Sequence, residues 1–389
     1  MGVSLSQIWR IHEDDVQTRR VFWAVIGVGL TIASILYGLK AAEDRSAFVR
    51  WRHQILQLSE GVNIYDQMLF PTPPIMPLTL YPLMLLPPVV GAMTWFLLKV
   101  GLTAGSVVMC LRIAEKDLER VPAWVGFLIV LLASRPILSD LHHGNNNLLI
   151  LFLIVSSLYA WTRGHDVLAG LAMALAISYK ITPALFIPYF LYKRSWRTSA
   201  AIGVGLVLYF LVIPSVLLGP AFNWELLSMW WHRILRPYVA NGVTGAMEIN
   251  QSMVGVLTRL LTEIPEGGRY GALRQINILS LDPGQVALLV KGLSLGLVLL
   301  LPILCRLKTD RRDDPRWLGE FALVVLTMLF VSERSWKHHF VTLLLPFTYL
   351  CHLLVDPGRP EGVKRGIVAS LVLATVLMAS TSSEFGGYF

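Results

Sequence analysis

The most chemically suggestive stretch of the sequence is a polar hinge between two apolar runs, residues 332–339, which reads SERSWKHH. It places Arg334, His338 and His339 close to Glu333. Arginine binds phosphate through its planar, bidentate fork, and histidine supplies either a positive charge or a neutral hydrogen-bond donor. The hinge is therefore either an anion-binding site or an ordinary loop that is polar because it meets water.

Four further polar clusters interrupt the apolar sequence. They are EDR at 43–45, SDLHHGNNN at 139–147, SYK at 178–180 and EINQS at 248–252. Each cluster alone is explained by helix capping or by a position at the membrane surface. Ionisable groups at the membrane edge cost several kcal/mol unless they are paired or line a wet cavity. Five such clusters on one side of the protein would therefore indicate a site.

The composition indicates the class of protein that must position these clusters. Hydrophobic residues make up 55% of the chain and charged residues 15%, and the mean hydropathy is +0.60. Soluble domains are about a quarter charged, so we predict an all-α, polytopic membrane protein. The three cysteines lie in apolar spans and indicate neither a disulfide framework nor a metal cluster. The net charge of +8 follows loop topology, so no nucleic-acid partner is predicted.

Apolar segments predict about eleven membrane crossings. They lie near residues 21–39, 92–111, 122–139, 147–162, 166–180, 182–192, 198–218, 284–305, 317–332, 339–355 and 365–382. With the N-terminus in the cytoplasm, inner segments hold 18 Lys and Arg in 59 residues, and outer segments hold 12 in 124. This bias favours that orientation, which places all five clusters outside.

The same orientation divides the chain into three parts. A cytoplasmic N-terminus covers residues 1–20, and its following apolar run is interpreted as an uncleaved anchor. The multi-spanning domain covers 21–382 with outer loops at 40–91 and 219–283, and an outer tail covers 383–389. We expect the protein in the plasma (inner) membrane.

The order and spacing of the outer motifs match a known family. The first loop carries an aspartate, an aromatic residue, a G-x-x-x-Y stretch and a Pro-rich run, at Asp44, Phe48, Gly61 to Tyr65 and Pro71 to Pro77. Later motifs are Gly144 to Asn147, Lys180 to Pro183, Asn250 to Ser252 with Arg259, and Ser332, Ser335, Trp336, His338 and His339. With these motifs the chain resembles glycosyltransferase family 87, whose members use polyprenyl-phosphate sugars. Asn145 stands where that family has Gln, and the Lys180 hinge is two residues longer.

The resemblance implies a GT-C-type fold and an inverting transfer with Asp44 as the general base. A phosphate leaving group needs cations or hydrogen-bond donors, but no acid to protonate it. The candidates for binding the donor phosphate are Arg334, His338, His339, Lys180 and His143. The candidates for binding the sugar or the acceptor are Asn145, Asn147, Asn250, Gln251, Trp336 and Tyr65. No cofactor is predicted, and a metal site built from the adjacent histidine pairs is disfavoured because they lack i, i+4 spacing.

Two alternatives remain open in the first outer loop. Glu43 competes with Asp44 as the base, because either carboxylate is also suited to capping the next helix or pairing with a neighbouring arginine. The stretch 43–61 predicts an amphipathic helix at the outer interface, with an apolar stripe that begins at Phe48 and Trp51. That stripe either holds the donor lipid near Asp44 or packs on other spans.

The donor implied by the resemblance is polyprenyl-phosphate mannose, with polyprenyl-phosphate arabinofuranose second. The predicted partners are this donor, a glycolipid or glycan acceptor, and membrane lipids. A flippase or small-solute transporter is the alternative from another class, supported by Lys99 and Lys291 within spans. An assembly subunit without chemistry is the third. The one-sided polar clusters and the lack of an internal duplication argue against a transporter, whose sites lie near the midplane between repeats.

Overall fold

Helices form every regular element in the structure, a computed structural model that describes residues 16–67, 70–115, 121–237, 247–264 and 275–380. No strand occurs in these ranges, so the all-α prediction is confirmed. Most of the predicted cytoplasmic terminus (1–15) and the predicted outer tail (383–389) lie outside the described residues.

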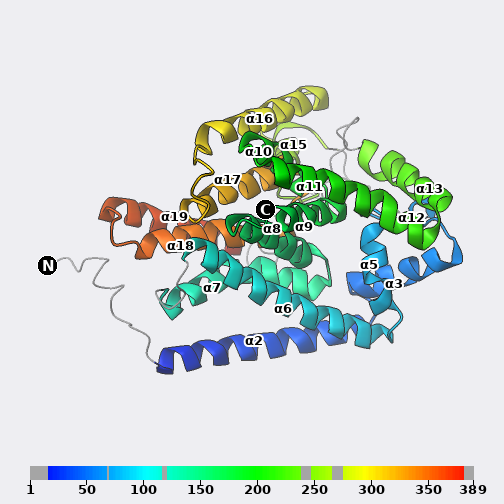
Figure 1. Cartoon of the computed structure of the whole chain (residues 1–389), viewed down its shortest axis with the longest axis horizontal. Helices are drawn as coiled ribbons and strands as arrows, with labels where there is room; N and C mark the ends of the chain where they lie inside the picture. Colours follow the sequence, from blue (N-terminus) through cyan, green and yellow to red (C-terminus); the bar gives the residue numbers. More distant parts are fainter. Residues whose placement is uncertain (1–15, 68–69, 116–120, 238–246, 265–274, 381–389) are drawn as a thin grey trace.

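The elements follow one another closely along the chain (Figure 1). The first half contains α2 (Val16–Ala42), α3 (Ala47–Gln57), η1 (Leu58–Glu60), α4 (Ile64–Gln67), α5 (Ile75–Met84), α6 (Pro88–Ala114), α7 (Ala123–His143), α8 (Asn147–Thr162) and α9 (Asp166–Tyr179). Then come η3 (Thr182–Leu185), α10 (Phe186–Tyr192), α11 (Trp196–Val207), η4 (Leu208–Val212), α12 (Ile213–Leu218), α13 (Pro220–Trp230) and η5 (Trp231–Leu235). The last part contains α15 (Met253–Leu261), α16 (Pro283–Leu304), α17 (Arg316–Val331), η6 (Lys337–Leu343), α18 (Leu344–Val355) and α19 (Glu361–Ser380).

Within the described ranges, 7 helices are long and apolar enough to cross a membrane. They are Arg20–Ala42, Pro88–Ala114, Ala123–His143, Trp196–Leu218, Pro283–Leu304, Lys337–Val355 and Glu361–Ser380. The chain is thus a multi-pass membrane protein, but the predicted count of eleven crossings is not confirmed. α8, α9 and α17 have 16, 14 and 16 residues, fewer than the roughly 20 that a straight crossing needs. These helices are largely buried in the bundle, and hydropathy alone does not distinguish a buried helix from a span.

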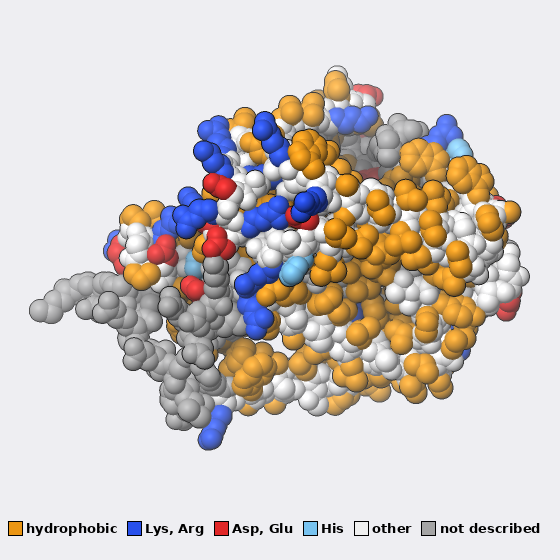
Figure 2. All heavy atoms as spheres, viewed as in Figure 1, with side chains coloured by type: hydrophobic (Ala, Val, Ile, Leu, Met, Phe, Trp, Pro, Cys, Tyr) orange, Lys and Arg blue, Asp and Glu red, His pale blue; other side chains and the backbone are white. Residues whose placement is uncertain are grey.

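Three segments that are predicted to be cytoplasmic lie at one end of the bundle, and two elements of the predicted outer loops lie at the other. Figure 1 shows the start of α2 and the α16–α17 and α18–α19 connections at the left, and α3 and α13 at the right. The core surrounds α8, which packs against α6 and α9. In Figure 2, apolar side chains cover the right of the visible face, and basic side chains gather toward the left.

The predicted amphipathic helix at 43–61 is observed as α3 followed by η1. Ser46 caps α3 by accepting a hydrogen bond from the backbone N–H of Val49. Phe48, Ile55 and Leu58 of the stripe are buried, and Phe48 stacks on Trp95 of α6. These three residues of the stripe therefore pack within the protein, whereas Trp51 is half-buried, and a role of the stripe in holding the donor lipid stays a prediction.

The end of α7 is fixed by Gly144, whose φ of 71° lies in the left-handed region that favours glycine. A Cβ on Gly144 would lie 2.7 Å from the Tyr37 hydroxyl and 3.3 Å from the backbone nitrogen of Phe48. This close approach places the α7–α8 connection directly against α2 and α3. Two of the predicted clusters are thereby brought together.

Candidate active site

Three of the five polar clusters meet at one cavity of about 1110 Å³. The predicted site residues that line it are Asn145, Asn147, Lys180, Arg334, Trp336, His338 and His339. The remaining ones, which lie outside its wall, are Asp44, Tyr65, His143, Asn250 and Gln251. The cavity is bounded by α3, the α7–α8 and α9–η3 connections, η5, α15, α16 and the α17–η6 hinge.

The cavity wall is predominantly cationic. Arg50, Lys180, Lys291 and Arg334 contribute positive charges, and Glu333 is the one carboxylate among the described lining residues. A cleft lined by one sign of charge concentrates ligands of the opposite sign. The wall therefore suits an anionic ligand.

The α7–α8 connection contacts the hinge through Asn145. The side-chain nitrogen Nδ2 of Asn145 lies 3.0 Å from Nε2 of His338, a separation that suits an amide donor and a neutral imidazole acceptor. The ring of His143 packs against that of His338, with centroids 5.3 Å apart, and its Nδ1 lies 2.8 Å from the carbonyl of Ser139. His143 thus supports His338 from outside the wall.

Asn147 and Lys180 form a second contact across the cavity wall. The Lys180 ammonium donates to Oδ1 of Asn147 at 3.0 Å. Lys180 follows α9 directly in extended backbone, which turns its side chain away from the helical path. Two clusters 33 residues apart in sequence are joined by this hydrogen bond.

The hinge is organised around His339. The rings of Trp336 and His339 are parallel, with centroids 6.1 Å apart, and Nδ1 of His339 lies 2.8 Å from the carbonyl of Arg334. The backbone nitrogen of Trp336 lies 3.3 Å from the same Nδ1, so the hinge backbone holds this side of the imidazole ring in place. The hinge therefore presents an imidazole and a guanidinium to the same cavity.

Glu333 is the acidic exception in this wall. Its Oε1 is buried and has no hydrogen-bond partner within the part of the chain that the structure describes. Burial raises the pKa of the Glu333 carboxyl to about 7, and the positive charge of Arg334 offsets part of this shift. The net charge of the cavity therefore changes near neutral pH.

This titration predicts a pH-dependent stability. Because the folded pKa is raised above the ordinary 4.5, the stabilisation by the neutral form is complete below that value and lost as the pH rises through 7. We expect Glu333→Gln to melt above the wild type at alkaline pH, with the gap closing as the pH falls below about 7. Melting temperatures in detergent across this range measure the gap, and a pH-independent gap would contradict the assignment.

The 248–252 cluster makes hydrogen bonds to the backbone of the hinge. Asn250 is buried, donates from Nδ2 to the carbonyl of Glu333 at 3.0 Å and accepts at Oδ1 from the backbone N–H of Ser335 at 3.0 Å. Ser252 Oγ donates to the same Glu333 carbonyl at 2.9 Å. The side chain of Gln251 donates to the carbonyl of Glu248 at 2.8 Å. Asn250 and Ser252 therefore hold the hinge backbone in place, and substrate binding by Asn250 and by Gln251 stays a prediction.

Because Asn250 contacts the hinge backbone and the side chain of Gln251 does not, substitutions at the two positions should have different effects. We expect Asn250→Ala to lower the free energy of unfolding by about 1–3 kcal/mol, because it leaves buried backbone groups unpaired.

Gln251→Ala should express normally but lower turnover or change sugar preference, since an amide recognises hydroxyls without adding charge. Chemical denaturation and turnover of both variants give the comparison. Unchanged turnover and sugar preference in Gln251→Ala would remove Gln251 from the site.

Tyr65 is fully buried beneath the first outer loop. Its hydroxyl donates to the carbonyl of Thr72 at 2.7 Å, and its ring meets Phe70 edge-on. Thr72 lines the cavity. Tyr65 therefore holds the Pro-rich segment in place, and direct substrate contact by Tyr65 stays a prediction.

Asp44 lies on the exposed turn between α2 and α3. Its φ is 55°, in the left-handed region. Glu43 pairs with Arg45 at 3.1 Å on the same turn. Asp44 is three residues before Ala47, which lines the cavity. Aspartate is among the residues that adopt this conformation readily, and Arg194 has the same φ, so the role of Asp44 as a base stays a prediction.

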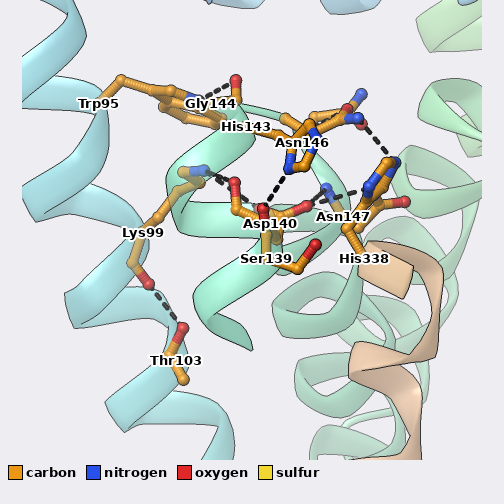
Figure 3. A network of polar contacts seen from close by, with 11 residues as sticks. Trp95, Lys99, Thr103, Ser139, Asp140, His143, Gly144, Asn146, Asn147 and His338 are labelled. Carbon is orange, nitrogen blue, oxygen red and sulfur yellow. Dashed lines mark hydrogen bonds and ion pairs between the residues drawn. The ribbon is translucent and has the colours of Figure 1, made fainter. Parts of the chain in front are cut away.

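Two residues directly behind the cavity wall are not assigned to the site by their sequence context. Asp140 of α7 and Lys99 of α6 form a buried ion pair directly behind Asn147 (Figure 3). Asp140 stands within the noted SDLHHGNNN cluster, but its partner lies 41 residues earlier inside an apolar helix. Among the described residues, no group of three or more His, Cys, Asp or Glu side chains is arranged to hold a metal ion.

Comparison with known proteins identifies the family to which this site belongs. The sequence model of glycosyltransferase family 87 matches residues 70–332. A polyprenol-phosphate-mannose-dependent alpha-(1-2)-phosphatidylinositol mannoside mannosyltransferase of Mycolicibacterium smegmatis is 27% identical over 232 residues, which cover 57% of this chain and 46% of that protein. The protein of the same name from Mycobacterium tuberculosis is 28% identical over 228 residues, covering 57% and 45%.

A third relative matches over a longer region. This polyprenol-phosphate-mannose-dependent alpha-(1-2)-phosphatidylinositol pentamannoside mannosyltransferase of M. smegmatis is 27% identical over 289 residues, covering 73% of this chain and 61% of that protein. The chain thus spans about half the length of the first two relatives. No solved structure matches the chain. Because the family model covers more than half of the sequence, including the α7–α8 and α9–η3 motifs, the chain belongs to glycosyltransferase family 87.

Proposed function

We propose that the protein is an inverting glycosyltransferase that moves mannose from a polyprenyl-phosphate donor to a hydroxyl of a glycolipid or glycan acceptor. The observation that carries the proposal is the cationic cavity, to which separate segments contribute Arg334, His338, His339 and Lys180. A sugar phosphodiester brings a negative charge that grows on the leaving oxygen as the bond breaks. Positioned cations stabilise that charge.

The choice of mannose rests on the relatives, whose names specify a polyprenol-phosphate-mannose donor and phosphatidylinositol mannoside acceptors. The volume of about 1110 Å³ leaves room for a sugar and for parts of two lipid head groups. The amides of Asn145 and Asn147 each make contacts within the protein, and the second hydrogen and second lone pair of each amide suit sugar hydroxyls. The indole of Trp336 suits stacking on a sugar face.

Asp44 is the proposed general base. An acceptor hydroxyl is a poor nucleophile until its proton is removed during the attack on the anomeric carbon. The hydroxyl oxygen then forms the new glycosidic bond, and the electron pair of the broken bond leaves with the polyprenyl phosphate. One carboxylate is sufficient because a phosphate leaves without protonation.

The site is proposed to face the extracytoplasmic side of the plasma membrane, with the N-terminus in the cytoplasm. The density of Lys and Arg in the alternate connections supports this orientation. α3 and α13, which belong to the two long predicted outer loops, also lie at the same end of the bundle (Figure 1).

Purified protein in detergent, given polyprenyl-phosphate mannose and phosphatidylinositol mannosides, tests the function. We expect a mannosylated lipid without any ion gradient, and no comparable product from polyprenyl-phosphate arabinofuranose. A preference for polyprenyl-phosphate arabinofuranose would change the assignment of the donor but not that of the reaction class. No product from either donor, together with sugar movement across sealed vesicles, would overturn the proposal in favour of a transporter.

A further inference from the structure

Behind the cavity wall lies an ion pair that the proposed reaction does not use directly. Lys99 of α6 and Asp140 of α7 both have side-chain exposures of 0%, and their Nζ and Oδ1 atoms are 3.1 Å apart. The same ammonium also donates to the backbone carbonyl of Asp140 at 2.7 Å. Neither residue lines the cavity.

The other oxygen of Asp140 leads toward the cavity (Figure 3). Oδ2 accepts hydrogen bonds from the backbone N–H of Asn147 at 3.1 Å and from its side-chain Nδ2 at 3.0 Å. A primary amide has one donor end and one acceptor end. Because the carboxylate takes the donor end, Oδ1 of Asn147 is turned to the Lys180 ammonium, which it holds at 3.0 Å.

The charges of the residues linked through Asn147 determine how much positive charge Lys180 offers to a ligand. An aspartate facing Lys180 without a counter-ion would cancel the positive charge that Lys180 brings to the cavity. Lys99 balances Asp140, and Asn147 separates Asp140 from Lys180 with a neutral group. The series of Lys99, Asp140 and Lys180 therefore carries one net positive charge, on the side chain that lines the cavity.

We propose that the Lys99–Asp140 pair is a positioning device, which orients Asn147 so that the Lys180 ammonium is held, uncancelled, for the phosphate of the lipid-linked donor. The inference rests on the proposed function, because it assigns that phosphate to Lys180. Lys99 and Asp140 act through Asn147, so they are positioning residues.

The chain offers a matched control in the pair of Lys193 and Glu320. Their Nζ and Oε2 atoms are 2.7 Å apart, and their side chains are 3% and 5% exposed. Neither residue lines the cavity. Replacing a buried ion pair by apolar residues of similar volume is often neutral for stability. Lys99→Met/Asp140→Leu and Lys193→Met/Glu320→Leu therefore remove the same kind of interaction at different places.

The experiment measures binding of polyprenyl phosphate, without a sugar, to purified proteins in detergent. We expect binding to weaken by about tenfold to a hundredfold in Lys99→Met/Asp140→Leu, as for the loss of a charge-assisted hydrogen bond, and to be unchanged in the control pair. The KM for the donor should rise in parallel, with the KM for the acceptor unchanged. Lys99→Met/Asp140→Asn provides the same test if that double variant fails to fold, because it leaves no unpaired buried charge and its amide no longer fixes the orientation of Asn147.

A Lys180→Met background distinguishes positioning from general damage. If the pair acts through Lys180, adding Lys99→Met/Asp140→Leu to Lys180→Met should cause no further loss of binding. Additive losses, or equal losses in the control pair, would overturn the inference. Wild-type protein that binds polyprenyl phosphate but makes no product would contradict the proposed function and leave this test intact, whereas wild-type protein that does not bind it would overturn both.

Discussion

Replacing Asp44 by Asn will lower the rate of sugar transfer by about 10²–10⁴-fold and leave folding and donor binding intact. The substitution removes the basic oxygen but keeps the size of the side chain. Asn also tolerates the left-handed backbone that Asp44 adopts at a φ of 55°, so the turn is not strained further. The loss is then attributable to the missing proton acceptor. Single-turnover transfer by purified protein, with polyprenyl-phosphate binding measured in parallel, checks it.

The neighbouring carboxylate provides the control for Asp44. Glu43 is engaged by Arg45 at 3.1 Å, and Glu43→Gln should change the rate little because an exposed pair contributes little. Asp44→Glu should be partly active, since the extra methylene displaces the carboxylate. Wild-type turnover in Asp44→Asn would remove Asp44 from the mechanism. Glu43 and Glu333, the carboxylate that lines the cavity, would be tested next.

Replacing Arg334 by Ala will weaken use of the donor by about 2–5 kcal/mol, because the donor phosphate loses a desolvated charged partner. Arg334→Lys should recover only part of this loss, since an ammonium does not reproduce the bidentate fork. The measurement is kcat/KM for the donor and for the acceptor separately. The acceptor value should change far less, because the guanidinium contacts the phosphate and not the attacking hydroxyl.

Lys337 is the control for this prediction. It lies in the same hinge but outside the cavity wall, so Lys337→Ala removes a positive charge without removing a ligand contact. We expect nearly wild-type donor use from it. Equal losses toward donor and acceptor in Arg334→Ala, with folding intact, would identify the hinge as purely structural.

The sequence was sufficient to predict the class of fold and the local breaks in it. Apolar runs near spanning length predict helices because a membrane leaves backbone groups no other partners. The hinge at 332–339 and the turn at Gly144 were visible because polar residues and glycine interrupt those runs. The number of crossings was not, because hydropathy alone does not distinguish a short buried helix such as α8 or α9 from a span.

The same limit applies to the site. Residue type showed that Tyr65, Asn250 and Asn147 carry hydrogen-bonding groups, but not where those groups are used. The structure directs Tyr65 to the carbonyl of Thr72 and Asn250 to the hinge backbone, whereas Asn147 and its neighbour Asn145 reach the cavity. Residue type and local sequence do not distinguish a polar side chain that reaches the cavity from one that lies outside its wall.

The sequence by itself determined an all-α membrane protein with five polar clusters, because hydropathy and charge bias are properties of short segments. Only the tertiary structure decided which clusters share a cavity and which residues stand behind it. Lys99 appeared in sequence as an isolated charge in an apolar helix, suited to a transport pathway. In the folded chain it is paired with Asp140, because α6 and α7 pack side by side. Pairing between residues 41 positions apart depends on how helices pack, and local sequence patterns carry no record of it.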